Sequence, residues 1–345
     1  MPEISPNDFS PGELRKLAAE HRGPNDLGYR PAVRFMNLTW SGAWGRAFEK
    51  ACSGVSTFGN VGADCTRFSN TRSVRAIHDD YLALTDRCEY ALDVDITLQQ
   101  ADYYNCVCAG DIHLGPPECA YAEWVKLCDW ILRTPDTGMI FHGDGLNVAT
   151  LLSPSSPAID RLPYSEQVDL LLHNLGPLAD AGCLRLVLAG NHEVRIRRAT
   201  GVDECPMRRV AHELGVPYGG YEQFVRWRIK GSKGIEVYTG YHHHGRGAAR
   251  TQGGILNNLV QMAMINRADY LAAGHTHHLF AHIITWREVA PDGEIIVRKA
   301  PVINTGSYQR TQGGSYSTEK AYAPALIGAA SIHLYGSKHS VHART

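Results

Sequence analysis

The sequence lacks several features that mark particular classes of protein. Its 345 residues carry a formal net charge of -1, so no overall basic field favours binding to nucleic acid. No apolar run approaches the roughly 20 residues that are needed to cross a bilayer. The first residues also lack the basic-then-apolar profile of a secretory signal. We therefore expect a cytoplasmic protein that has no membrane partner.

Closely spaced cysteine pairs, which are typical of structural zinc sites, are also absent. The nine cysteines are scattered along the chain and odd in number. Cys106 and Cys108 alternate within an apolar stretch, which indicates packing rather than a redox pair. We expect reduced thiols, as is usual in the cytosol, and a structural zinc protein is disfavoured.

The composition of the chain changes near residue 100. With 44% hydrophobic residues, the chain can form one large domain, or one domain and an appendage. Residues 1–98 are irregular in pattern and contain two short predicted helices and a predicted strand, 88–98. We interpret residues 1–98 as an N-terminal accessory segment whose role the sequence does not specify.

Short apolar strands alternate with helical stretches in residues 99–345, which is the pattern of a layered α/β domain. The predicted strands are 103–109, 138–142, 184–189, 234–241, 269–273, 278–287 and 294–303. The predicted helices are 118–133, 165–178, 208–214 and 255–265. The last two strands would form a hairpin whose turn contains Pro291, Asp292 and Gly293.

Polar clusters follow five of the predicted strands. Each cluster contains residue types that bind metal ions, together with glycine, which permits tight turns. The clusters are G-D-I-H at 110–113, G-D-G-L-N at 143–147, G-N-H-E at 190–193, H-H-H-G at 242–245 and G-H-T-H at 274–277. Because ligands commonly gather at the carboxyl ends of strands, we expect these clusters to converge in space.

The ligand types in these clusters suit two metal ions. Carboxylates combined with imidazoles favour transition metals over Ca or Mg, and we expect Mn, with Fe, Zn, Co or Ni as alternatives. Seven ligand residues exceed the needs of one four-coordinate ion but fit two ions that share a bridging carboxylate. Two ions about 3.5–4 Å apart can activate a shared water and bind the attacking and leaving oxygens of an in-line displacement. That chemistry is hydrolysis at phosphorus.

The order of the five motifs resembles the calcineurin-like metallophosphoesterase superfamily. The motifs are D-x-H, G-D, G-N-H-E, H-G and G-H-x-H, and the resemblance covers the chain from about Cys106 onward. Stretches such as 191–195, 200–203, 214–218 and 315–324 are closer to the phage- and prophage-type phosphoesterases, for which host cytoplasm is the expected location. The family's serine/threonine phosphatases carry an arginine after the second motif. This sequence has Gly145, Leu146 and Asn147 there, so a protein phosphatase is disfavoured.

The resemblance implies a fold. It is an α/β fold, a four-layer α/β/β/α sandwich of two mixed β-sheets flanked by helices, with the N-terminal segment as an appendage. Residues 99–345 would form the catalytic domain.

The resemblance also implies roles for the residues of the motifs. The ligands of one ion would be Asp111, His113 and His277. The ligands of the other ion would be Asn191, His244 and His275. Asp144 would bridge the two ions, and a bridging hydroxide would attack phosphorus. His192 would protonate the leaving oxygen or stabilise charge in the transition state.

Two of these assignments leave alternatives open. His242 and His244 should point to the same side of a strand, with His243 opposite. The family pattern places the ligand before a glycine, which selects His244 and leaves His242 as the fallback. Glu193 could hold His192 in position, or it could have no such role.

Substrate contacts are less specific in the sequence. Guanidinium groups match the geometry of phosphate, so Arg250 or Arg246 could bind the substrate, although a solvated loop is the commoner location of such residues. Asn147 could contact the substrate or cap a helix. His142 could orient a metal ligand or be a buried strand residue.

Three functional hypotheses follow from these observations. The arginines and the phage-type resemblance favour phosphodiester, nucleotide or nucleic-acid substrates, and a phosphomonoesterase is the alternative. A non-catalytic interaction module on the same fold is disfavoured, because every ligand type is present. Nothing in the sequence specifies the oligomeric state.

Overall fold

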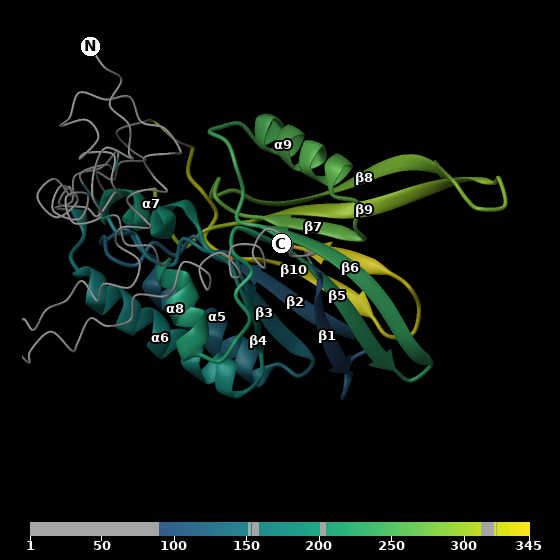
Figure 1. Ribbon diagram of the computed structural model, residues 1–345, viewed down its shortest axis with the longest axis horizontal. Helices are drawn as coiled ribbons and strands as arrows, with labels where there is room; N and C mark the ends of the chain where they lie inside the picture. The colour runs from purple at the N-terminus through teal and green to yellow at the C-terminus, as the bar shows by residue number, and fades with distance from the viewer. Residues whose placement is uncertain (1–89, 151–152, 154–158, 201–204, 312–320, 322) are drawn as a thin grey trace, which may run out of the picture. The chain divides into compact units, whose positions relative to one another are not determined.

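Two mixed β-sheets pack face to face, and helices cover the outer face of each (Figure 1). The structure is a computed structural model that describes residues 90–150, 153, 159–200, 205–311, 321 and 323–345. The described residues belong to one compact unit that begins at Cys88. This architecture confirms the predicted α/β/β/α sandwich. The two helices predicted within residues 1–98 lie outside the described residues, and the predicted domain boundary stays a prediction.

The first sheet has five strands in the order β11-β10-β2-β3-β4. These strands are β2 (Tyr103–Ala109), β3 (Thr137–Phe141), β4 (Leu184–Val187), β10 (Ala330–Tyr335) and β11 (Val341–Arg344). β2, β3 and β4 run parallel, whereas β10 and β11 pair antiparallel. Every residue of β3 is buried, as is typical of a parallel strand that is covered on both faces. The carboxyl ends of β2, β3 and β4 therefore meet at one edge of this sheet.

The second sheet has six strands in the order β1-β5-β6-β7-β9-β8. These strands are β1 (Leu92–Thr97), β5 (Glu222–Gly231), β6 (Gly234–His243), β7 (Tyr270–Ala273), β8 (Leu279–Val289) and β9 (Ile295–Thr305). β6 and β7 run parallel, while β5 is antiparallel to β6 and β8 is antiparallel to β9. The carboxyl ends of β6 and β7 therefore also lie together.

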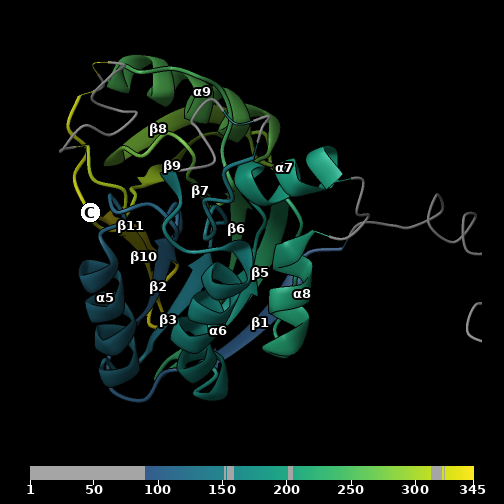
Figure 2. The same ribbon diagram turned by 90° about the vertical axis from the view of Figure 1, so that its left-hand side faces the viewer.

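Helices pack on the two outer faces (Figure 2). α5 (Tyr121–Arg133), α6 (Tyr164–Asp180) and α8 (Pro206–Glu213) share an apolar core with the five-stranded sheet. α9 (Gln252–Ile265) packs against the six-stranded sheet through Ile255, Leu259 and Met262. The short helix α7 (Asn191–Thr200) begins shortly after the end of β4. The strands β2, β3 and β7 are thus buried on both faces, which holds their carboxyl ends in fixed positions, whereas β5 and β8 keep exposed residues on one face.

A second apolar core fills the space between the sheets. It contains Trp227 and Tyr270 from the six-stranded sheet and Cys106, Cys108 and Ile140 from the five-stranded sheet. The two cysteines are buried free thiols, which agrees with the packing role predicted for them. This core also holds polar atoms, since the Trp227 indole donates to the Tyr270 hydroxyl at 2.7 Å.

The alternation predicted from residue 99 onward is confirmed, with element boundaries shifted by a few residues. Four elements, β5, β10, β11 and α7, were not predicted from the sequence. β5 carries a readable signal, because buried Val225, Trp227 and Ile229 alternate with exposed Arg226 and Arg228. The third polar cluster, expected in a loop, instead begins α7.

Within the described part of the chain, no helix is both long and apolar enough to cross a membrane.

The packing of α5 gives a direct test of the fold. Trp124 is fully buried against Phe141 and Tyr308, whereas Trp130 on the same helix is 47% exposed. We expect Trp124→Ala to lower the free energy of unfolding by about 3–5 kcal/mol, because it leaves a large cavity. The matched control, Trp130→Ala, should change it by about 0.5 kcal/mol or less. Urea denaturation measures both, and equal effects would contradict this packing.

Candidate metal centre

Five loops meet where the parallel strands end. They follow β2, β3 and β4 of one sheet and β6 and β7 of the other. The eight residues predicted as ligands or catalyst lie in these loops or, for Asn191 and His192, in the first turn of α7, and side chain and backbone contacts connect them. They are Asp111, His113, Asp144, Asn191, His192, His244, His275 and His277.

Asp111, His113 and His277 form the first ligand group. Asp111 Oδ1 lies 3.5 Å from His277 Nε2 and 3.8 Å from His113 Nε2, and these two nitrogens are 3.0 Å apart. Asp111 is fully buried, and its Oδ1 has no hydrogen-bond partner among the described residues. A buried carboxylate oxygen that faces two imidazole nitrogens without a hydrogen bond fits a cation site.

Asp144, Asn191, His244 and His275 form the second ligand group. His244 Nε2 lies 3.4 Å from Asp144 Oδ2 and 3.1 Å from Asn191 Oδ1. His244 Nδ1 donates to the His142 carbonyl at 2.7 Å, and His275 Nε2 donates to a loop carbonyl at 3.0 Å. These bonds occupy one nitrogen of each ring and leave the other nitrogen facing the cluster, where it can bind a metal ion in place of a proton.

Asp144 lies between the two ligand groups. Its Oδ2 is 3.4 Å from His244 Nε2 in the second group and 4.0 Å from His113 Nε2 in the first. Its Oδ1 accepts a hydrogen bond from the backbone N–H of His192 at 2.8 Å. This carboxylate is therefore in reach of ions held by either group.

The electrostatics of the site favour positive charge. Burial opposes ionisation of both carboxyl groups, yet neighbouring imidazoles hold the pKa of Asp111 and of Asp144 well below the usual range. Burial also opposes a charge on His244, but Asp144 and Asp111 raise the pKa of this imidazole to about 10. A divalent cation can take the place of that proton, so the donor set fits a divalent metal.

The backbone is strained at the same positions. Asp111, His113, Asp144, His275 and His277 have φ values between 49° and 71°, in the left-handed region that side chains other than glycine rarely adopt. Each such residue costs on the order of 1 kcal/mol and persists only where the surrounding structure imposes it. Among the described residues, five of the eight non-glycine positions with positive φ are thus predicted ligands, which favours a functional reason for the strain.

Two glycines let the loops approach the carboxylates. A Cβ atom on Gly190 would lie 2.0 Å from Asp144 Oδ1, and one on Gly274 would lie 2.6 Å from Asp111 Oδ2. The glycines of the third and fifth motifs are therefore required by close contact with the two carboxylates.

Glu193 connects the loop after β3 to the start of α7 and, among the described residues, makes no hydrogen bond that would hold the His192 ring. The carboxylate is fully buried, and it accepts hydrogen bonds from the backbone N–H groups of Gly190, Asp144 and Leu146 at 2.9–3.1 Å. Burial and the nearby charge of Asp144 raise its pKa to about 7. The idea that Glu193 positions His192 is thus replaced by a different role, which is to fix the backbone around Asp144.

His192 faces the ligand groups through Nε2. Its Nδ1 donates to the carbonyl of Asn147 at 2.6 Å, and its Nε2 lies 4.0 Å from Asp144 Oδ2. Burial lowers the pKa of His192 to about 3, despite the opposing charge of Asp144. The ring is therefore neutral at pH 7, with its lone pair directed into the site.

The structure groups His244, rather than the fallback His242, with the predicted ligands. His242 Nε2 contacts the Tyr270 hydroxyl at 2.8 Å and His242 Nδ1 contacts His142 Nε2 at 3.2 Å. Both of its ring nitrogens are thus used inside the core between the sheets. His142 and His242 are fully buried, and burial lowers the pKa of both imidazoles, that of His142 to about 4.

The two ligand groups border a cleft of about 600 Å³. Arg250 and Asn147, two of the predicted substrate contacts, line this cleft, and Asn147 Nδ2 donates to Asp160 at 2.6 Å. Arg246 is not among the lining residues, and its guanidinium donates to Gln261 of α9.

Arg195 lines the cleft and donates to Ser153 at 2.7 Å. The sequence analysis did not select Arg195, although its position two residues after the third motif was visible.

Comparisons with known proteins give likenesses in fold only. No protein-family model and no curated protein matches the chain. One similar solved structure is a conserved uncharacterized protein, a predicted phosphoesterase, from Streptococcus pneumoniae TIGR4. It is 14% identical, has a TM-score of 0.32, and the alignment covers 72% of this chain and 91% of that one.

Two further similar structures are Vps29 proteins. Vps29 from Chaetomium thermophilum is 12% identical with a TM-score of 0.31, over 71% of this chain and 96% of that one. Wild-type Vps29 from Entamoeba histolytica, solved in complex with Zn²⁺, is 13% identical with a TM-score of 0.29. Its alignment covers 70% of this chain and 97% of that one.

The role of Glu193 can be tested by an isosteric change. Glu193→Gln places an amide NH₂ against backbone N–H donors, so we expect the free energy of unfolding to fall by about 1–3 kcal/mol. The affinity for Mn²⁺ should fall as well, because the loop that carries Asp144 is no longer fixed. The control Glu213→Gln alters an exposed ion pair on α8 and should change neither quantity. Unchanged stability and metal affinity in Glu193→Gln would contradict the proposed role.

Proposed function

We propose that the protein is a metal-dependent phosphoesterase that holds two divalent ions. The observation that carries this proposal is the arrangement of two ligand groups around one shared carboxylate, Asp144, at the edge of a cleft. Asp111, His113 and His277 would hold one ion. Asn191, His244 and His275 would hold the other. When bound, such ions supply Lewis acidity and lower the pKa of water, which is the chemistry needed for hydrolysis at phosphorus.

Two arginines support a phosphate substrate. Arg195 and Arg250 line the same cleft as His113 and Asn191. A guanidinium group forms paired hydrogen bonds with phosphate oxygens and keeps its charge at all physiological pH values. In the proposal, these arginines bind the non-reacting oxygens and orient the ester so that phosphorus faces Asp144.

His192 would act on the leaving oxygen. Its Nδ1 is held by the Asn147 carbonyl, so Nε2 is the atom that faces the cleft. To protonate a leaving alkoxide, the ring must first take up a proton, which the negative charge of a bound phosphate ester favours. The same ring would otherwise stabilise charge in the transition state through a hydrogen bond.

The proposed substrates are phosphodiesters, including nucleotides or nucleic acids, with Mn²⁺ as the proposed metal. The lining of the cleft includes the alanines 248, 249, 321, 323 and 325 beside the arginines. Such a surface accommodates a bulky organic group on each side of a phosphate better than a pocket closed around a monoester. A phosphomonoesterase is the alternative within the same mechanism.

Hydrolysis of bis-p-nitrophenyl phosphate beside p-nitrophenyl phosphate tests this function. We expect cleavage of the diester by chelator-stripped protein only after Mn²⁺ is added. Activity on the monoester alone would indicate a phosphomonoesterase. If neither ester is cleaved and elemental analysis finds no bound metal, the enzyme proposal is wrong and a non-catalytic interaction module takes its place.

The bridging role of Asp144 has its own test. We expect Asp144→Asn to abolish diester cleavage, because a neutral amide cannot serve two ions, while the melting temperature with chelator stays near that of the wild type. The matched control, Asp93→Asn, alters a surface ion pair with Arg226 on β5 and should retain full activity. Near-normal turnover by Asp144→Asn would refute the bridging role.

The role of His192 is tested by its removal. We expect His192→Ala to bind both metal ions and to slow turnover by about 10² or more, as for loss of a general acid. The control His173→Ala changes an exposed position on α6 and should be as active as the wild type. If His192→Ala instead loses a metal ion, His192 is a ligand and not the acid.

A further inference from the structure

Four buried polar side chains form a continuous chain beside the metal centre. Trp227 on β5 contacts Tyr270 on β7 at 2.7 Å, and Tyr270 contacts His242 on β6 at 2.8 Å. His242 Nδ1 then meets His142 Nε2 at 3.2 Å, which connects the six-stranded sheet to the loop after β3. All four side chains are fully buried. We refer to Trp227, Tyr270, His242 and His142 as the buried relay.

One arrangement of protons satisfies every polar atom of the buried relay. His142 Nδ1 contacts the His243 carbonyl at 3.1 Å and must donate to it, which leaves Nε2 as an acceptor in the neutral ring. His242 Nδ1 therefore donates to His142, and His242 Nε2 accepts from the Tyr270 hydroxyl. The Tyr270 oxygen in turn accepts from the Trp227 indole. A network that is fully satisfied in an apolar core makes its members rigid.

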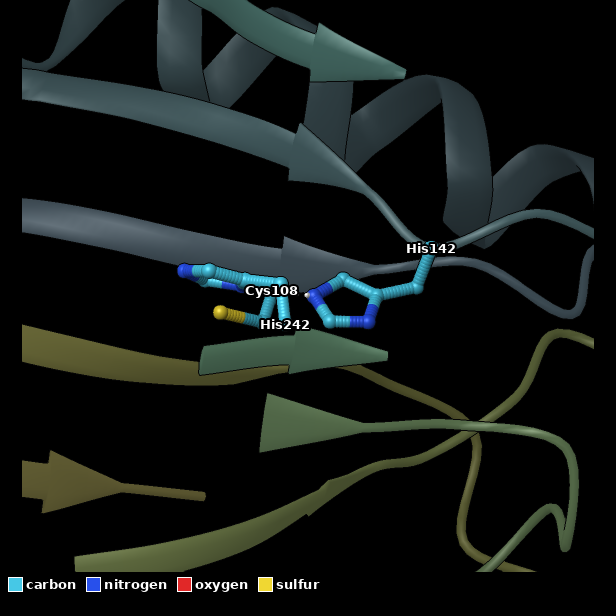
Figure 3. A group of neighbouring side chains, drawn as sticks. All are labelled: Cys108, His142 and His242. Carbon is cyan, nitrogen blue, oxygen red and sulfur yellow. Dashed lines mark hydrogen bonds between the residues drawn. The ribbon is translucent and has the colours of Figure 1, made fainter. Parts of the chain in front are cut away.

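Cys108 lies close to both imidazoles of the buried relay (Figure 3). The thiolate of Cys108 together with His142 and His242 could hold a metal ion, since their ligand atoms are within 4.8 Å of one another. An ion there would make His242 Nε2 a donor to Tyr270, whose oxygen already accepts from Trp227. The Tyr270 hydroxyl proton would then have no acceptor among the described residues. The geometry therefore favours hydrogen bonds over an ion.

The buried relay is connected to the metal centre by reciprocal bonds. The His142 side chain donates to the carbonyl of His243, and the His244 side chain donates to the carbonyl of His142. These two bonds join the loop that carries Asp144 to the loop that carries His244. They therefore help to set the 3.4 Å distance between His244 Nε2 and Asp144 Oδ2.

We propose that the buried relay positions the second ligand group, by fixing the distance between Asp144 and His244 and the tautomer of His244. None of the four residues touches the substrate or an ion in this proposal, so they are positioning residues and not catalytic ones. The inference rests on the proposed metal centre and extends it into the core between the sheets. Hydrogen-bond partners of this kind typically change metal affinity by about 10- to 100-fold when they are removed.

The test compares Mn²⁺ affinities of chelator-stripped variants, measured by competition with a fluorescent indicator. We expect His242→Leu to weaken the binding of one ion by about 10- to 100-fold, because His142 loses its donor. His242→Asn keeps a donor near the position of Nδ1 and should restore affinity to within a few-fold of the wild type. Ile332→Ala creates a cavity in the same core and removes none of the relay's hydrogen bonds, so its affinity should equal that of the wild type.

Tyr270→Phe provides a milder version of the same test. It keeps the ring and removes only the hydroxyl that donates to His242, so the variant should fold even if His242→Leu does not. We expect a loss of affinity of about 10-fold for one ion, the lower end of the effect of such partners. Affinities of Tyr270→Phe and His242→Leu that match that of Ile332→Ala would overturn the proposal, since the relay would then be core packing only.

The outcomes separate this inference from the proposed function. A wild-type protein that binds no Mn²⁺ would overturn the metal centre itself. A wild-type protein that binds two ions, with variants of unchanged affinity, would overturn only the positioning role. A third ion found by elemental analysis and lost in Cys108→Ser would also overturn the relay, in favour of a buried metal site.

Discussion

The burial of two carboxylates is the constraint on which the rest of the site depends. Asp111 and Asp144 are almost completely shielded from water, and an ionised carboxylate without water must be paired with positive charge or with hydrogen-bond donors. The backbone N–H groups of His275 and His192 donate to one oxygen of each. The other oxygen of each faces imidazole nitrogens. The negative charge on these two buried oxygens makes the cluster a candidate site for divalent metals.

The two sheets contribute to this cluster in different ways. The carboxylates follow strands of the five-stranded sheet, whereas His244, His275 and His277 follow strands of the six-stranded sheet. Neither sheet carries all the candidate ligands of either group, so the candidate site depends on how the sheets pack. Glu193 fixes the backbone on the carboxylate side, and polar contacts within the core connect that side to His244. The strain in the ligand loops is therefore balanced by bonds made outside the cluster.

Strand periodicity was sufficient to predict the alternation of strands and helices, and the polar clusters at strand ends could be located because they are local signals. The four-layer arrangement was implied by the resemblance to a known family. The sequence could not predict the partners of Glu193, since the backbone N–H groups of Asp144, Leu146 and Gly190 leave no pattern in the sequence. The alternation rule treated His242 and His244 as equivalent, but β6 ends at His243 and Gly245 has φ of 122°, so the rule does not extend to His244. Arg246 was selected and Arg195 was missed for a similar reason, because loop conformation decides which guanidinium lines the cleft.

An anomalous diffraction experiment at the manganese edge, on crystals grown with Mn²⁺, would test the central claim most directly. We expect two peaks about 3.5–4 Å apart, one on each side of the Asp144 carboxylate. One peak should lie against Asp111 and His277 and the other against His244 and Asn191. A map with no peak among these residues, or with a single peak that Asp144 does not touch, would contradict the account.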